Sequence, residues 1–179
     1  MSRISLLTAM LALSGLLHAE IRVSTDFEGG TAEVVSLDQN TKTLRIMPKL
    51  HEGRGWPCWW YFRLDGLPLD QDFTLEVQAQ TKPFRENQVL AAAWCQPEHA
   101  WLSTNGETWS PSDAGRRTED GVMIYKIKPT SSQLHLAWGP PFAPSDADEL
   151  LFEIAAKLPE AKRFELAKTR DGRPVNGIR

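Results

Sequence analysis

The chain has 179 residues, of which 41% are hydrophobic and 24% are charged, a balance typical of globular proteins that excludes disorder of the whole chain. Its formal net charge of -3 leaves no basic surplus to neutralise a run of phosphates, so nucleic acid is not expected as its main partner. Two cysteines are too few for a four-cysteine zinc site or a disulfide-stapled miniprotein.

Residues 1–19 have the pattern of a secretory signal peptide. A positive start precedes an uncharged apolar stretch over residues 4–17, and the small Ala19 precedes Glu20. A membrane anchor is the alternative, but this stretch is shorter than the ~20 residues that span a bilayer. We therefore expect cleavage after Ala19, export to the periplasm or the extracellular space, and no membrane attachment of the mature chain.

Short strands and turns follow in the mature chain. Residues 32–37 and 43–47 predict a hairpin around an Asp/Asn turn, and Phe73 to Ala79 shows the clearest apolar alternation. The expected strands are residues 21–24, 32–37, 43–47, 59–64, 73–79, 90–94, 107–109, 122–127 and 133–138. Because no helical period separates these segments, the sequence predicts a mainly β domain over residues 20–139, an antiparallel β-sandwich.

The pattern changes after this domain. Residues 140–144 contain three prolines and predict a stiff linker. Ser145 has the character of an N-cap for an amphipathic helix, whose apolar side is formed by Leu150, Leu151, Ile154, Ala155 and Leu158. A strand over 164–169 and a returning strand that begins at Pro174 follow. One helix and half a hairpin do not bury a core, so residues 145–179 are expected to open a second domain that is incomplete in this chain.

The sequence offers no complete catalytic or metal-binding motif. The histidines after the signal segment, His51, His99 and His135, lack the spacing of zinc ligands. No Gly-x-Ser-x-Gly elbow, phosphate loop or dinucleotide fingerprint occurs. For His135, which lies in an expected strand, a hydrogen-bonded structural imidazole is favoured over a ligand or a base. No catalytic residue and no metal ligand is therefore assigned.

The tryptophans are the strongest positive signal. In the strand over residues 59–64, Trp60 and Phe62 share one face, so the two faces should differ, one buried and the other exposed or covered by another domain. The candidate exposed aromatic or interdomain surface comprises Trp56, Trp59, Tyr61 and Arg63. Packing within a core and stacking on sugars or peptides both remain open for these aromatic side chains.

Cys58 and Cys95 lie beside two of the aromatic segments. In an exported chain a disulfide between them is one interpretation, and two buried free thiols are the other. We expect the two residues to approach each other, because both flank segments that should pair or stack in one sandwich.

Segments along nearly the whole mature chain carry a family resemblance. Asp26-Phe27-Glu28-Gly29-Gly30 and Gly55-Trp56-Pro57-Cys58-Trp59-Trp60-Tyr61-Phe62-Arg63 resemble the amino-terminal sandwich domain that precedes the peptidase domain in zinc carboxypeptidases of the cytosolic-carboxypeptidase-like branch. The segment from Trp138 to Asp146 is similar to the family's linker into the first peptidase helix, and Lys168 to Val175 resembles the hairpin that opens the peptidase domain.

The resemblance implies an enzyme family that holds zinc with a His-x-x-Glu pair and a later His, with a distal Glu as general base and an Arg for the terminal carboxylate of a peptide substrate. None of these positions matches a residue of this chain, so zinc is expected only in the full-length family member. The resemblance thus identifies residues 145–179 as the incomplete beginning of an α/β peptidase domain. It predicts an exported amino-terminal accessory domain that is inactive alone and acts with a carboxypeptidase domain in cis.

Two other functions remain open. In the first, the chain would be a secreted sandwich that binds carbohydrate or peptide through exposed tryptophans. In the second, it would be a truncated and functionally silent product. The unpaired strand expected after Pro174 favours the accessory domain or the truncated product, because a self-contained binding module needs no such strand.

Overall fold

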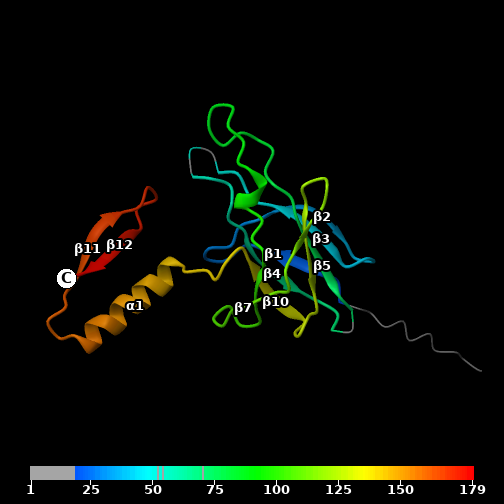
Figure 1. The fold of residues 1–179 in the computed structure, drawn as a ribbon. Helices are drawn as coiled ribbons and strands as arrows, with labels where there is room; N and C mark the ends of the chain where they lie inside the picture. The colour runs from blue at the N-terminus through cyan, green and yellow to red at the C-terminus, as the bar shows by residue number, and fades with distance from the viewer. Residues whose placement is uncertain (1–18, 52, 54, 70) are drawn as a thin grey trace, which may run out of the picture.

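The computed structural model describes residues 19–51, 53, 55–69 and 71–179 (Figure 1). The predicted signal segment lies, apart from Ala19, outside the described residues. Within the described part of the chain, no helix is long and apolar enough to cross a bilayer.

Two five-stranded sheets form the sandwich that the sequence predicts. The first, called the β4 sheet, has the order β1 (Arg22–Ser24), β4 (Tyr61–Asp65), β10 (Gln133–Ala137), β6 (Trp101–Ser103) and β7 (Ser110–Pro111). The second, called the β5 sheet, has the order β2 (Glu33–Asp38), β3 (Thr43–Met47), β5 (Phe73–Val77), β9 (Met123–Ile127) and β8 (Arg116–Arg117). All neighbouring pairs are antiparallel except β3 and β5, which run parallel. The predicted hairpin of β2 and β3 is confirmed.

The core lies between the two sheets, and alternation along residues 60–64, which include most of β4, decides which aromatic side chains enter it. Trp60 and Phe62 are 0% exposed, as their shared face predicts. The Trp60 indole N–H donates to the Cys95 carbonyl at 2.9 Å, so the one polar atom of this large side chain is paired. Its ring centroid lies 6.4 Å from that of Tyr125 on β9, which joins the two sheets through aromatic packing.

Two of the expected strands are wrong. Residues 90–94 instead contain a short 3-10 helix, η1 (Ala92–Trp94), consistent with a run of alanines that has low strand propensity. Residues 107–109 form a turn, because the Asn105 side chain accepts hydrogen bonds from the N–H groups of Glu107 and Thr108 at 3.0 and 2.9 Å. The strands β6, β7 and β8, with three, two and two residues, are too short to show a period in the sequence.

After the linker, α1 (Pro144–Lys157) packs beside the hairpin of β11 (Arg163–Lys168) and β12 (Pro174–Ile178). The helix begins earlier than predicted. Its N-cap is Ala143, whose N–H donates to the Asp146 side chain at 2.6 Å, and Pro144 occupies the first turn, where its missing N–H costs nothing. The prediction of half a hairpin with an unpaired strand after Pro174 is wrong, because β12 pairs with β11 along its length.

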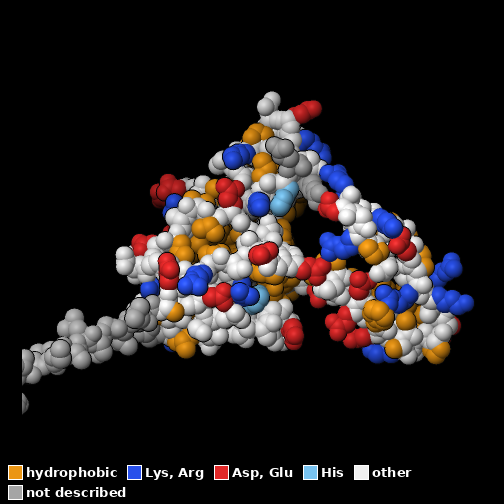
Figure 2. All heavy atoms as spheres, turned by 180° about the vertical axis from the view of Figure 1, so that it is seen from behind, with side chains coloured by type: hydrophobic (Ala, Val, Ile, Leu, Met, Phe, Trp, Pro, Cys, Tyr) orange, Lys and Arg blue, Asp and Glu red, His pale blue; other side chains and the backbone are white. Residues whose placement is uncertain are grey.

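We call residues 144–178 the helix–hairpin unit. Figure 2 shows it as a lobe beside the sandwich, with acidic and basic side chains where the lobes approach each other. No residue of α1 is buried, and Leu150, Phe152 and Leu158 are 47%, 60% and 47% exposed. On the predicted apolar side of the helix, Leu150 and Leu158 are thus exposed, whereas Leu151, Ile154 and Ala155 are half-buried.

Candidate interdomain surface

Four indole rings meet at the end of the sandwich where the linker begins. We call them the tryptophan surface, and they are Trp56, Trp59, Trp94 and Trp138. Trp56 and Trp94 are each 51% exposed, with ring centroids 5.0 Å apart in an edge-to-face arrangement. The Trp138 indole N–H donates to the Trp94 carbonyl at 2.9 Å, and its ring lies 6.1 Å from that of Trp59.

Different elements hold these rings in place. The helix η1 carries Trp94, and a tight turn closed by a 2.9 Å hydrogen bond from Cys58 N–H to the Trp56 carbonyl carries Trp56. The candidate surface that the sequence predicts does not include Trp94 or Trp138. For Trp138 a signal existed, because it stands two residues before the proline-rich linker.

Tyr61 is the clearest correction to the predicted surface. It is only 7% exposed and therefore is not an exposed aromatic side chain. Its ring is covered by Phe27 at 4.8 Å, by Trp109 at 5.5 Å and by His135 at 5.9 Å, and we call these four residues the Tyr61 cluster. Burial, followed by the negative charge of Asp146 on α1, raises the pKa of Tyr61.

Arg63 is half-exposed but engaged within the β4 sheet. Its Nε donates to Asp65 Oδ2 at 3.1 Å, and Asp65 also accepts a 2.8 Å hydrogen bond from Gln133. The Gln133 hydrogen bond and then Arg63 hold the pKa of Asp65 below its usual value. Of the four predicted surface residues, Trp56 and Trp59 belong to the tryptophan surface, Arg63 is paired within its sheet, and Tyr61 is buried.

His135 packs in the Tyr61 cluster, with its Nδ1 3.3 Å from the Tyr61 hydroxyl. Burial, reinforced by Arg63 and opposed by Asp65, lowers the pKa of His135. Protonation therefore favours the unfolded chain. The contribution of the neutral His135 ring to the free energy of unfolding should be complete above about pH 6.5. It should be lost as the pH falls from there through the pKa of His135 in the folded chain.

Urea unfolding between pH 7.5 and pH 5 tests this expectation. The His135→Gln variant should show a flatter fall of unfolding free energy over this range than the unchanged chain. Parallel curves for the two proteins would contradict it.

Both cysteines are free thiols in the structure. Cys95 belongs to the buried core, Cys58 packs against the same core, and the Cys95 thiol donates to the Ala92 carbonyl at 3.3 Å. Burial raises the pKa of Cys58 and raises that of Cys95 to about 11. A disulfide between them stays a prediction, which the intact mass under non-reducing conditions tests.

The reactivity of the two thiols should differ, because the thiolate is the reactive form. With a thiol reagent at pH 8, we expect the half-buried Cys58 to be modified well before Cys95 in the folded chain. Peptide mapping of partly labelled protein measures the order, and preferential labelling of Cys95 would be incompatible with its burial.

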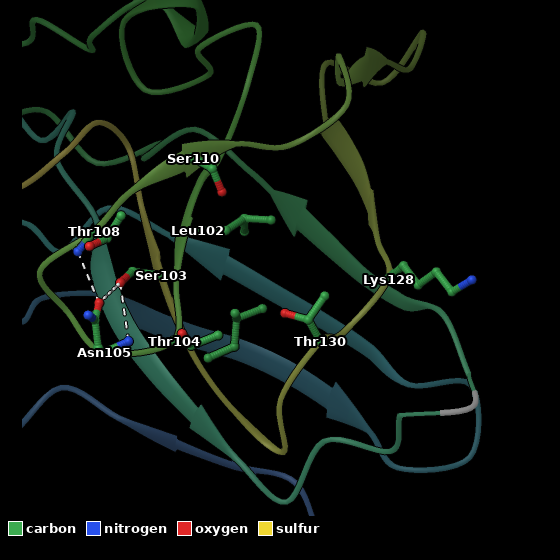
Figure 3. Close-up of a pocket in the computed structure, with 9 residues that line it drawn as sticks. Leu102, Ser103, Thr104, Asn105, Thr108, Ser110, Lys128 and Thr130 are labelled. Carbon is green, nitrogen blue, oxygen red and sulfur yellow. Dashed lines mark hydrogen bonds between the residues drawn. The ribbon is translucent and has the colours of Figure 1, made fainter.

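An open pocket of about 300 Å³ lies away from the tryptophan surface, between the segment after β6 and the β9–β10 connection (Figure 3). The Ser103 hydroxyl donates a hydrogen bond to Asn105 Oδ1 at 3.0 Å, so these two side chains stabilise the β6–β7 turn and are not free to bind a ligand. Leu102 extends into the pocket, whereas the amine of Lys128 points away from it. The pocket is thus lined by hydroxyl groups and apolar side chains. Among its lining residues, no nucleophile is in contact with a general base.

The described residues do not fit a zinc ion. Within residues 19–51, 53, 55–69 and 71–179, no group of three or more His, Cys, Asp or Glu side chains could hold a metal. His99 Nδ1 lies 2.8 Å from the Ser112 carbonyl, and His135 faces Tyr61, so both rings are engaged in structural contacts. The predicted lack of catalytic residues stays a prediction for the chain as a whole.

Comparisons with known proteins give a consistent result. The family model described as the cytosolic carboxypeptidase N-terminal domain matches residues 23–138. The metallo-carboxypeptidase from Burkholderia cenocepacia has a similar structure, with a TM-score of 0.69 and 19% identity over 88% of this chain and 39% of that one. The metallo-carboxypeptidase from Pseudomonas aeruginosa in complex with (2-guanidinoethylmercapto)succinic acid is also similar. Its TM-score is 0.66 and its sequence identity is 18%, over 88% of this chain and 39% of that one.

At these identities the structural likeness shows the fold alone. The chain spans less than two-fifths of the length of these neighbours, since it covers 39% of each. A search of curated proteins found no match.

Proposed function

This chain belongs to the cytosolic carboxypeptidase N-terminal domain family, and from that membership we propose that it is the amino-terminal accessory part of an exported zinc carboxypeptidase-like protein. In this proposal the zinc, the general base and the peptide site belong to a carboxypeptidase domain in cis, for which the sandwich provides a packing surface. The signal pattern of residues 1–19 supports export.

The observation that carries the proposal is the position of the tryptophan surface. Two indoles that are each 51% exposed lie together, and Trp138 of the same surface leads directly into the linker. A contiguous apolar patch of this kind marks an interaction site. Covering the exposed half of one indole, about 100 Å², would contribute roughly 2.5 kcal/mol. A domain that follows the linker is the nearest partner for such a contact.

Footprinting with hydroxyl radicals tests the partner. Trp56 and Trp94 should be oxidised in the chain alone and protected in a longer protein in which a peptidase domain follows it. Leu69, which is 57% exposed on a loop of the sandwich, serves as the control and should react equally in both proteins. Equal oxidation of the two tryptophans in both proteins would remove the support for this interface.

A second experiment tests the assignment of chemistry. After dialysis, the purified chain should retain no stoichiometric zinc and should release no carboxy-terminal residues from peptides, because a catalytic zinc needs about three protein ligands. Elemental analysis and peptide mass spectrometry measure the two properties. Bound zinc together with metal-dependent release would show that this chain carries its own catalytic site.

The exposed indoles also favour one alternative, a secreted module that binds carbohydrate or peptide. A pocket of about 250 Å³ beside Trp56 includes Lys49 and His51, which places polar groups next to an aromatic face. Titration of the chain with oligosaccharides and short peptides, followed by NMR, would then shift the indole signal of Trp56. The Trp56→Ala variant should lose the response, whereas Phe142→Ala, at a 67% exposed linker position, should keep it.

A further inference from the structure

The loop over residues 25–31 is held firmly against β4. The N–H of Thr31 donates to the Tyr61 carbonyl at 2.7 Å, and the N–H of Tyr61 donates back to Thr31 at 2.8 Å. The Phe27 ring packs edge-on against the Tyr61 ring, with centroids 4.8 Å apart. Glu28 therefore lies between two anchored positions of the chain.

Two glycines make this loop compact. A Cβ on Gly30 would lie 2.4 Å from the Thr25 carbonyl oxygen, so only glycine allows this closure. Gly29 adopts a φ of +77°, a conformation that favours glycine, and its carbonyl accepts a 3.4 Å hydrogen bond from the Trp59 indole. The backbone that carries Glu28 is thus fixed from both sides.

From this loop, Glu28 reaches both parts of the helix–hairpin unit. Its Oε2 accepts from the Ser145 N–H in the first turn of α1 at 3.4 Å, and its Oε1 accepts from Arg173 Nη1 at 2.9 Å. Arg173 ends the hairpin turn, where its N–H donates to Thr169 Oγ1 at 3.0 Å. The Ser145 side chain, and more weakly the charge of Arg173, hold the pKa of Glu28 below its usual value.

The helix and the hairpin are also joined to each other. The Asn176 side chain donates to Asp148 Oδ1 at 2.6 Å, and the Arg163 guanidinium lies 3.5 Å from the centre of the Phe152 ring. Because these contacts make one unit of α1 and the hairpin, a single carboxylate that bonds both elements constrains the orientation of the whole unit.

We propose that Glu28 is a positioning residue that orients the helix–hairpin unit relative to the sandwich. A carboxylate at a helix N-terminus is favoured by the helix dipole, and the Arg173 contact is charge-assisted. The inference rests on the proposed function only in treating the unit as the start of the next domain. In that role, Glu28 would set the angle at which the following domain meets the tryptophan surface.

The expected effect is a shift of population rather than unfolding. Glu28 and Arg173 are 39% and 54% exposed, so each contact changes the ratio of oriented to free units by roughly two- to fivefold. The linker keeps the unit close to the sandwich, which makes a shift of this size measurable in orientation.

Residual dipolar couplings of the labelled chain test the proposal. In the unchanged protein, the sandwich and the unit should share one alignment tensor. In Glu28→Ala, the couplings of the unit should shrink while those of the sandwich persist. Arg173→Ala alters the other partner of the ion pair and should shrink the couplings of the unit in the same direction, independently of any effect of Glu28→Ala on the loop.

Glu33→Ala, at an exposed position of β2, is the matched control and should leave all couplings unchanged. Unchanged couplings of the unit in both the Glu28 and Arg173 variants would overturn the proposal, as would a unit that already tumbles freely in the unchanged chain. The dipolar couplings require neither zinc nor enzymatic activity, so they can contradict the role of Glu28 while the proposed accessory function stands. Conversely, the hydroxyl-radical footprinting can contradict the interface at the tryptophan surface while Glu28 still orients the unit.

Discussion

Replacing Trp60 with Ala should lower the free energy of unfolding by about 3–5 kcal/mol. The side chain is 0% exposed and fills the space between the two sheets, so its removal leaves a large cavity. Its loss also removes the 2.9 Å hydrogen bond that satisfies the Cys95 carbonyl. Because domains of this size are stable by about 5–15 kcal/mol, the variant should be close to unfolding at 37 °C.

The Trp56→Ala variant is the matched control, since Trp56 lies four residues earlier and is 51% exposed. Its cost should be below about 1 kcal/mol, in the range of surface substitutions. Urea unfolding followed by circular dichroism compares the two variants. Similar midpoints for both would show that Trp60 does not form the core.

The opposite roles of Trp60 and Tyr61 show what can be predicted from the sequence. Alternation places Phe62 of β4 and Trp60, the residue just before β4, on one face and Tyr61 on the other, and the structure confirms this division. Alternation cannot tell which neighbours cover the second face. Tyr61 is buried by Phe27, from a loop, and by His135, from a strand 74 positions away.

The same limit applies to the candidate surface. Its local part, Trp56 beside Trp59, is visible in the sequence, whereas the contact of Trp94 with Trp138 joins residues 44 positions apart. A three-residue 3-10 helix that carries Trp94 has no periodicity to reveal it. Long-range partners therefore decide the composition of the surface, and these partners follow from the strand order of the sandwich.

The contact of Glu28 was equally hidden. The sequence shows a glycine turn at residues 28–30, and the resemblance marks the same segment as a family feature. Neither indicates that the carboxylate meets Arg173, which lies 145 positions further along the chain. Because only glycine fits at position 30, a substitution there can test whether this loop holds Glu28 in place.

Replacing Gly30 with Ala should destabilise the chain by about 1–3 kcal/mol, the range for forced overpacking. The added Cβ would lie 2.4 Å from the Thr25 carbonyl oxygen and 3.0 Å from that of Phe27, and backbone atoms cannot rotate away as a side chain can. The loop must shift, which should loosen the packing of Phe27 on Tyr61 and release Glu28 from the helix–hairpin unit. Gly139→Ala is the control, because a Cβ there meets nothing within 4 Å. Urea unfolding measures the loss of stability, and the NMR signals of the Tyr61 ring measure the change in its packing. If the Gly30→Ala variant kept both its stability and its Tyr61 environment, the loop would tolerate a side chain and would not hold Glu28 in place.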